Sequence, residues 1–105
     1  MDSVLGMIGL AKRAGKICTG AEICEAAIKK GKSKLIIIAG DISDNGKKAI
    51  TDACKYYNVK YIEYADKKKL GNFTGSDERA VVSVNDTGFA ETILKKYAGA
   101  YDRKE

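Results

Sequence analysis

Residues 19–41, TGAEICEAAIKKGKSKLIIIAGD, decide the fold of this chain. The first half predicts a helix, because Thr19 and Glu22 have the spacing of a capping box and Gly31 supplies a C-terminal stop. The second half contains Leu35 to Ala39, an apolar run rich in β-branched residues, which is typical of a strand covered on both faces. The stretch therefore predicts a helix that leads into a central strand.

Patterns on either side of this stretch predict the other elements. Before it, Ser3 caps a helix that ends at Gly15, and a short extended segment follows. After it come a helix up to Asn58, a strand over 59–64, a short helix capped by Asp66, a strand over 80–84 and a helix up to residue 97. This alternation predicts an α/β protein, a three-layer α/β/α sandwich around a small mixed sheet of about four strands.

The chain has 105 residues, which suits a single domain. We expect this domain to cover residues 1–98 and residues 99–105 to form a frayed C-terminal tail. No apolar run approaches the ~20 residues that span a bilayer, and the first residues lack the cationic start of a secretory signal. We therefore expect a cytoplasmic protein that is monomeric and does not contact a membrane.

The composition argues against catalysis and metal binding. The sequence contains no histidine, so the commonest acid–base side chain at neutral pH is missing. Cys18, Cys24 and Cys54 lack CxxC spacing and lie among apolar neighbours, as small buried side chains do, with a redox-sensing thiol as the alternative. We therefore expect no catalytic residue, no metal and no cofactor.

The positive charge is concentrated before and within the deciding stretch. The net charge is +5, and residues 12–34 hold seven cations against two glutamates. Such an excess fits a solvated surface as well as a binding surface. However, a helix that begins at Gly20 exposes backbone N–H groups, and Lys12, Arg13 and Lys16 precede it closely. We expect these cations and N–H groups to lie side by side and to bind a phosphate backbone.

Several motifs together resemble the superfamily of kink-turn RNA-binding proteins that includes ribosomal proteins L7Ae and L30e, and within it the small bacterial YlxQ-like branch. The motifs are Leu10 to Lys16, Gly20 to Gly31, Lys34 to Asp41, Tyr56 to Val59, and Leu70-Gly71 with Gly75. The resemblance covers nearly the whole chain up to Tyr97 and implies an L30e-like fold. It also implies that the helix N-terminus at Gly20 faces the widened major groove of a kinked RNA, and that the loop 75–79 covers an extruded nucleotide.

The residues and the resemblance together give our predicted RNA-binding site. Its members are Lys12, Arg13, Lys16, Gly20, Ala21, Glu22, Lys34, Ser76, Asp77 and Arg79. The expected partner is ribosomal RNA or another structured, kink-turn-like RNA, so the protein would be part of a ribonucleoprotein. The YlxQ-like resemblance implies a bacterial translation or transcription setting, with ribosomal, transcription or translation proteins as further partners.

One departure from the family leaves a second hypothesis open. The best-known helix motif of the family reads G-x-N-E-x-x-K, whereas residues 20–26 read GAEICEA and share only the glycine. The alternative is therefore a protein-interaction module on the same scaffold that has lost specific RNA readout. Ile23 discriminates between the two, because an isoleucine exposed beside the cap indicates a protein contact or a groove unlike the family's.

Overall fold

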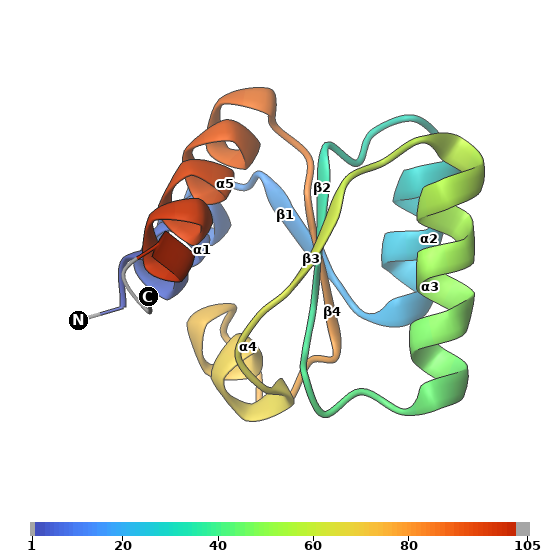
Figure 1. Cartoon of the computed structure of the whole chain (residues 1–105), viewed down its shortest axis with the longest axis horizontal. Coiled ribbons are helices and arrows are strands. Elements are labelled where there is room, and N and C mark those ends of the chain that lie inside the picture. The colour runs from blue at the N-terminus through green and yellow to red at the C-terminus, as the bar shows by residue number, and fades with distance from the viewer. Residues whose placement is uncertain (1, 103–105) are drawn as a thin grey trace.

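A computed structural model, which describes residues 2–102, shows three layers with the sheet in the middle (Figure 1). The elements in chain order are α1 (Ser3–Arg13), β1 (Ile17–Thr19), α2 (Ala21–Lys29), β2 (Leu35–Ile38), α3 (Asp44–Tyr57), β3 (Tyr61–Glu63), α4 (Lys67–Phe73), β4 (Val81–Val84) and α5 (Thr87–Asp102). The sheet has four strands in the order β1-β4-β2-β3. Strand β4 is antiparallel to β1 and β2, whereas β3 is parallel to β2. The predicted α/β class, the three layers and the mixed sheet are confirmed.

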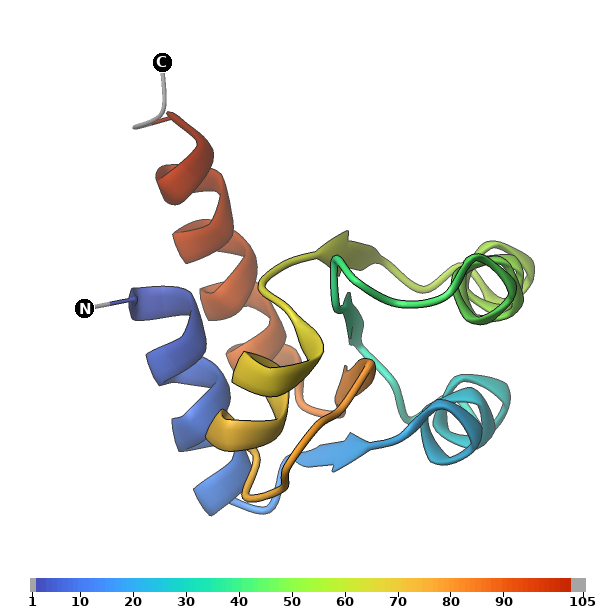
Figure 2. The same ribbon diagram turned by 90° about the horizontal axis from the view of Figure 1, so that it is seen from below.

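The central strand β2 contributes side chains to two hydrophobic cores, one on each face of the sheet. Helices α1, α4 and α5 cover one face of the sheet, and α2 and α3 cover the other (Figure 2). Leu35 and Ile37 pack into the first core, and Ile36 and Ile38 into the second. Successive side chains of a strand point to opposite faces, so a strand between two helical layers needs apolar residues at every position. This is the reason that the uninterrupted apolar run correctly predicted a central strand.

Two predicted helix starts are wrong. Asp2 rather than Ser3 caps α1, and its Oδ1 accepts a hydrogen bond of 3.0 Å from the backbone N–H of Leu5. The capping box of α2 does not form, because Thr19 belongs to β1 and the N-cap is Gly20. Gly20 has a φ of 98°, a backbone conformation that favours glycine, and no side chain caps the helix.

The end of α3 and the start of α4 agree with the sequence-based predictions. Asn58 ends α3 in the left-handed conformation, with a φ of 59°, and Asp66 caps α4 by accepting a hydrogen bond of 2.8 Å from the N–H of Lys69. The strands are shorter than predicted, and β3 keeps only three residues. Helix α5 continues to Asp102, past residue 98, and the domain bounds stay a prediction. Residues 103–105 of the predicted tail lie outside the described residues.

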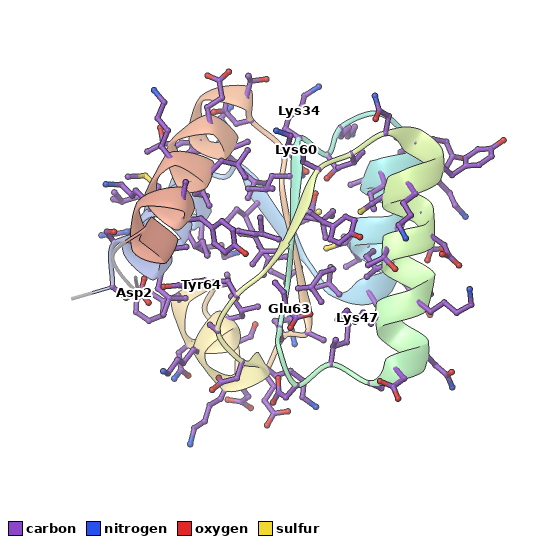
Figure 3. The ribbon with its side chains drawn as sticks, in the orientation of Figure 1. Asp2, Lys34, Lys47, Lys60, Glu63 and Tyr64 are labelled. Atoms are coloured by element: carbon purple, nitrogen blue, oxygen red, sulfur yellow. The ribbon has the colours of Figure 1, made fainter. Side chains whose placement is uncertain are left out.

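Tyr64 connects the end of β3 to the start of α1. Its hydroxyl donates a hydrogen bond of 2.7 Å to Oδ2 of Asp2, which also caps α1 (Figure 3). Its ring meets the ring of Tyr97 edge-on, with 5.9 Å between the centroids. Burial in the first place, and the contact with Asp2 in the second, raise the pKa of Tyr64 from 10.0 to about 12.

The raised pKa predicts a loss of stability in alkali that depends on Tyr64. Because the folded pKa lies above the unfolded value, neutral Tyr64 stabilises the fold fully below about pH 10, and this contribution disappears as the pH rises through about 12. We expect Tyr64→Phe to reduce the alkaline fall in unfolding free energy and to cost about 1 kcal/mol at pH 7, where the hydrogen bond is lost. Urea unfolding at pH 7 to 12 measures both effects. Tyr61→Phe, on the exposed side of β3, is the control, and an equal alkaline fall in both variants would contradict the assignment.

Candidate functional site

The N-terminus of α2 presents backbone N–H groups that no side chain caps. The N–H of Gly20 donates to the carbonyl of Val81 at 3.0 Å, and the carbonyl of Gly20 accepts the first helical bond from Cys24 at 2.9 Å. The N–H groups of residues 21–23 precede this first helical bond, and all three residues are exposed. The first turn therefore offers several donors and the positive end of the helix dipole to an external acceptor.

Arg79 reaches this helix end from a distant part of the sequence. Its Nε donates to Oγ1 of Thr19 at 3.1 Å, and its Nη1 donates to the carbonyl of Glu78 at 2.8 Å. These bonds use two of the five N–H donors of a guanidinium group. The backbone N–H of Arg79 donates to the carbonyl of Lys67 at 2.9 Å, which ties this residue to α4. Arg79 is thus held in one position directly beside Gly20.

The loop 75–79 lies at the same end of the sheet. The N–H of Ser76 donates to the carbonyl of Gly71 at 2.8 Å, and Asp77 and Glu78 are exposed. Their carboxylates repel phosphate but accept hydrogen bonds from the donors of bases and sugars. Six predicted site residues therefore share the end of the sheet where β1 stops and β4 starts, namely Gly20, Ala21, Glu22, Ser76, Asp77 and Arg79.

The structure does not bring the predicted cations to this place. Lys12 and Arg13 lie in the last turn of α1, and the carbonyl of Lys16 accepts a bond from Asn85 at the far end of β4. The N–H of Lys34 donates to Val84 at that same far end. Strand β1 separates the two groups by about 10 Å, the length of three extended residues, and α1 and α2 lie on opposite faces of the sheet (Figures 1 and 2). The predicted single cluster is therefore wrong, whereas RNA binding by these four residues stays a prediction.

Ile23 is exposed in the first turn of α2. The residue is 59% exposed, so it does not belong to the core. It stands where the family motif has an acid, next to the uncapped N–H groups. By the criterion derived from the sequence, this exposure indicates a protein contact or a groove unlike that of the best-known family members.

Thr19 is the site residue that sequence reasoning misread. The capping-box spacing assigned its hydroxyl to α2, but that hydroxyl accepts the hydrogen bond from Arg79. No local signal could reveal this contact, because 60 residues separate the two partners. The antiparallel pairing of β1 with β4, which sets Thr19 opposite Val82, brings the two residues together.

The cysteines have the chemistry of buried thiols. Burial in the first place, and then the neighbouring Cys18, raise the pKa of Cys24 far above its usual range. Burial alone raises the pKa of Cys54 to about 11. Both thiols are therefore protonated at neutral pH and poor nucleophiles.

Residues 2–102 contain neither a candidate metal site nor a candidate membrane span. Over that range, no three or more His, Cys, Asp or Glu side chains gather in a way that could hold a metal ion. Nor does any helix there combine the length and the apolar character that crossing a bilayer requires.

Comparison with known sequences finds a family match over most of the chain. The model of the "Ribosomal protein L7Ae/L30e/S12e/Gadd45 family" matches residues 2–94. "RNA-binding protein YlxQ" of Bacillus subtilis (strain 168) is 36% identical over 88 residues, which cover 84% of this chain and 88% of that protein. "RNA-binding protein YlxQ" of Enterococcus faecium is 38% identical over 98 residues, which cover 93% of this chain and 94% of that protein.

Comparison with solved structures finds the same architecture at lower sequence identity. The "15.5kD RNA binding protein" of Giardia lamblia superposes with a TM-score of 0.75 at 25% identity. The superposition covers 90% of this chain and 84% of the Giardia chain. The arrangement of helices and strands is therefore shared even where most side chains differ.

Proposed function

This chain belongs to the ribosomal protein L7Ae/L30e/S12e/Gadd45 family, and we propose on that premise that it is an RNA-binding protein that acts without catalysis. The observation that carries the proposal is the uncapped N-terminus of α2 with Arg79 held beside it. Backbone N–H groups and a guanidinium group are the donors that bind phosphate and base acceptors. The relatives named as RNA-binding proteins support the same assignment.

We assign the partner to structured RNA of the kink-turn type, in a ribosomal setting. A kinked RNA has a widened groove that admits the first turn of a helix. The first turn of α2 has exposed N–H donors that fit such a groove. The loop 75–79, with its exposed carboxylates, would accept hydrogen bonds from an extruded nucleotide. The family match to ribosomal proteins supports the ribosomal setting.

A titration of a fluorescent kink-turn hairpin tests this proposal. We expect the logarithm of the association constant to fall with the logarithm of the salt concentration at a slope of roughly −3 to −4, as for about four neutralised phosphates. Arg79→Glu should weaken binding about ten- to hundredfold, because a charge-assisted contact contributes about 1.5–3 kcal/mol. Lys95→Glu, on the exposed side of α5, changes the net charge equally and is the control.

Two results would overturn the proposal. A folded wild-type protein that binds neither the hairpin nor other folded RNAs at 25 mM salt would remove RNA binding altogether. In that case the exposed Ile23 favours the second candidate function, a protein-interaction module. Equal weakening by Arg79→Glu and Lys95→Glu would show that net charge alone drives binding, and that the α2 N-terminus is not the contact.

A further inference from the structure

Three of the strands begin at one edge of the sheet, and a lysine precedes each of them. Lys16 precedes β1, Lys34 precedes β2 and Lys60 precedes β3. The strands β1, β2 and β3 run in the same direction, because β4 is antiparallel to the first two and β3 is parallel to β2. All three lysines are exposed, and Figure 3 shows Lys34 and Lys60 together at this end of the sheet. We call this row the lysine edge.

The lysine edge lies opposite the proposed contact at the α2 N-terminus. Neighbouring strands are about 4.8 Å apart, so the backbones of Lys34 and Lys60 are adjacent, and Lys16 lies about 10 Å from Lys34 across β4. The hydrogen bonds between β2 and β3 agree with this placement, since the carbonyl of Lys60 accepts a bond of 2.9 Å from the N–H of Ile36. The two ends of the sheet therefore present two separate surfaces.

A cavity of about 380 Å³ opens beside Lys34 and Lys60. Its wall also includes Lys29, Tyr57, Asn58 and the backbone of Gly31. Its volume falls within the usual range of small-ligand sites, about 300–1,000 Å³. Three lysines thus line a space whose volume suits one nucleotide.

The positive charge of this cavity is largely uncompensated. No carboxylate lines it among the described residues, and only Lys29 has an acidic partner, Glu25 at 3.5 Å. Lysines near helix C-termini often compensate the helix dipole. At the end of α2, the Nζ of Lys34 donates a long hydrogen bond of 3.5 Å to the carbonyl of Gly31, which uses one of the three donors of its ammonium group. Neither Lys34 nor Lys60 forms an ion pair with a carboxylate among the described residues, so both charges are available to an external anion.

One tyrosine adds an aromatic surface to the cavity. Tyr57 lines it and is 42% exposed, and the next ring along the chain, Tyr56, lies outside the lining and is 82% exposed. Their rings meet edge-on with 4.9 Å between the centroids. Exposed aromatic rings next to cations are the combination that binds single-stranded nucleic acid, because bases stack on the rings while cations neutralise the phosphates.

We propose that the lysine edge is a second RNA-binding surface, which holds a single-stranded segment with one base against Tyr57 and its phosphates on Lys34 and Lys60. This inference rests on the proposed function, because it treats the partner as RNA. The continuation of the row to Lys16 favours an extended chain of phosphates over an isolated one. One molecule of the protein then connects two RNA segments, a structured one at the α2 N-terminus and a single strand at the opposite end of the sheet.

A recruitment assay tests this proposal with the α2 N-terminus already occupied. An immobilised kink-turn hairpin is saturated with the full chain, and a fluorescent twelve-residue oligouridylate is then added. We expect the loaded surface to recruit the oligouridylate. Recruitment is measured per molecule of hairpin-bound protein, and the double variant Lys34→Glu/Lys60→Glu should reduce it at least tenfold. Tyr57→Leu should reduce recruitment about fivefold or more, since one stacked base is lost.

The matched control is Lys48→Glu/Lys95→Glu, which changes the net charge equally at exposed positions of α3 and α5. Circular dichroism melts verify that each variant folds. Equal recruitment by the two double variants would overturn the inference. So would displacement of the oligouridylate by polyglutamate as readily as by unlabelled oligouridylate, because the surface would then fit acidic proteins.

The assay separates the two proposals. If the protein does not load onto the hairpin, the proposed contact at the α2 N-terminus fails. The lysine edge is then tested directly by titrating the free protein with oligouridylate. The same pair of double variants decides that titration, and equal affinities would overturn the inference there as well.

Discussion

Restoring the family motif at the start of α2 is expected to raise the affinity for a kink-turn hairpin about ten- to hundredfold. The change is Glu22→Asn, Ile23→Glu and Ala26→Lys. All three positions are exposed, so the fold should tolerate the substitutions. An amide that reads a base edge contributes about 1–3 kcal/mol of discrimination, and the added lysine provides one more phosphate contact. The salt dependence should therefore steepen by about 0.7–0.9.

The control for this prediction is Glu25→Gln. It raises the net charge by the same one unit on the same helix but lies outside the motif. Fluorescence titrations of both variants at several salt concentrations measure the effect. An unchanged affinity in the folded triple variant would show that the α2 N-terminus does not enter the groove of the kinked RNA. A gain that Glu25→Gln matches would assign the effect to charge alone.

Gly71→Ala is expected to destabilise the protein by about 2 kcal/mol and to weaken RNA binding at the same time. A Cβ at this position would lie 2.6 Å from the carbonyl oxygen of Asp77 and 2.7 Å from Cα of Glu78. Both atoms belong to the backbone and cannot rotate away, so the loop 75–79 must move, and overpacking of this kind costs about 1–3 kcal/mol. Since this loop carries Arg79, its displacement should also disturb the contact with Thr19.

Gly6→Ala is the matched control for Gly71→Ala. Gly6 lies within α1, and a Cβ there would meet nothing within 4 Å. Alanine should therefore stabilise the helix by about 0.5–1 kcal/mol through its higher helix propensity. Urea unfolding of both variants gives the two free energies, and hairpin titration gives the affinities. Equal stability of the two variants would contradict the close packing of the loop on Gly71.

Local patterns predicted the elements because local forces form them. Asn58 ends a helix since its short polar side chain tolerates the left-handed conformation, and Asp66 caps one since its carboxylate reaches an N–H three residues on. Thr19 had the same local chemistry and was misread, because tertiary pairing gave its hydroxyl a different donor. Tyr57 likewise has the spacing of an apolar helix face, yet it lines an open cavity at the helix end.

The amino-acid sequence alone thus determined the α/β class, the central strand, the order of the elements and the absence of histidine chemistry, because composition, capping and hydrophobic period act over a few residues. Only the tertiary structure decided which charged residues share a surface. The directions of β1, β2 and β3 relative to β4 place Arg79 beside Gly20 and send Lys16 and Lys34 to the opposite end of the sheet. Strand direction depends on pairings between residues far apart in the chain, which no local pattern contains.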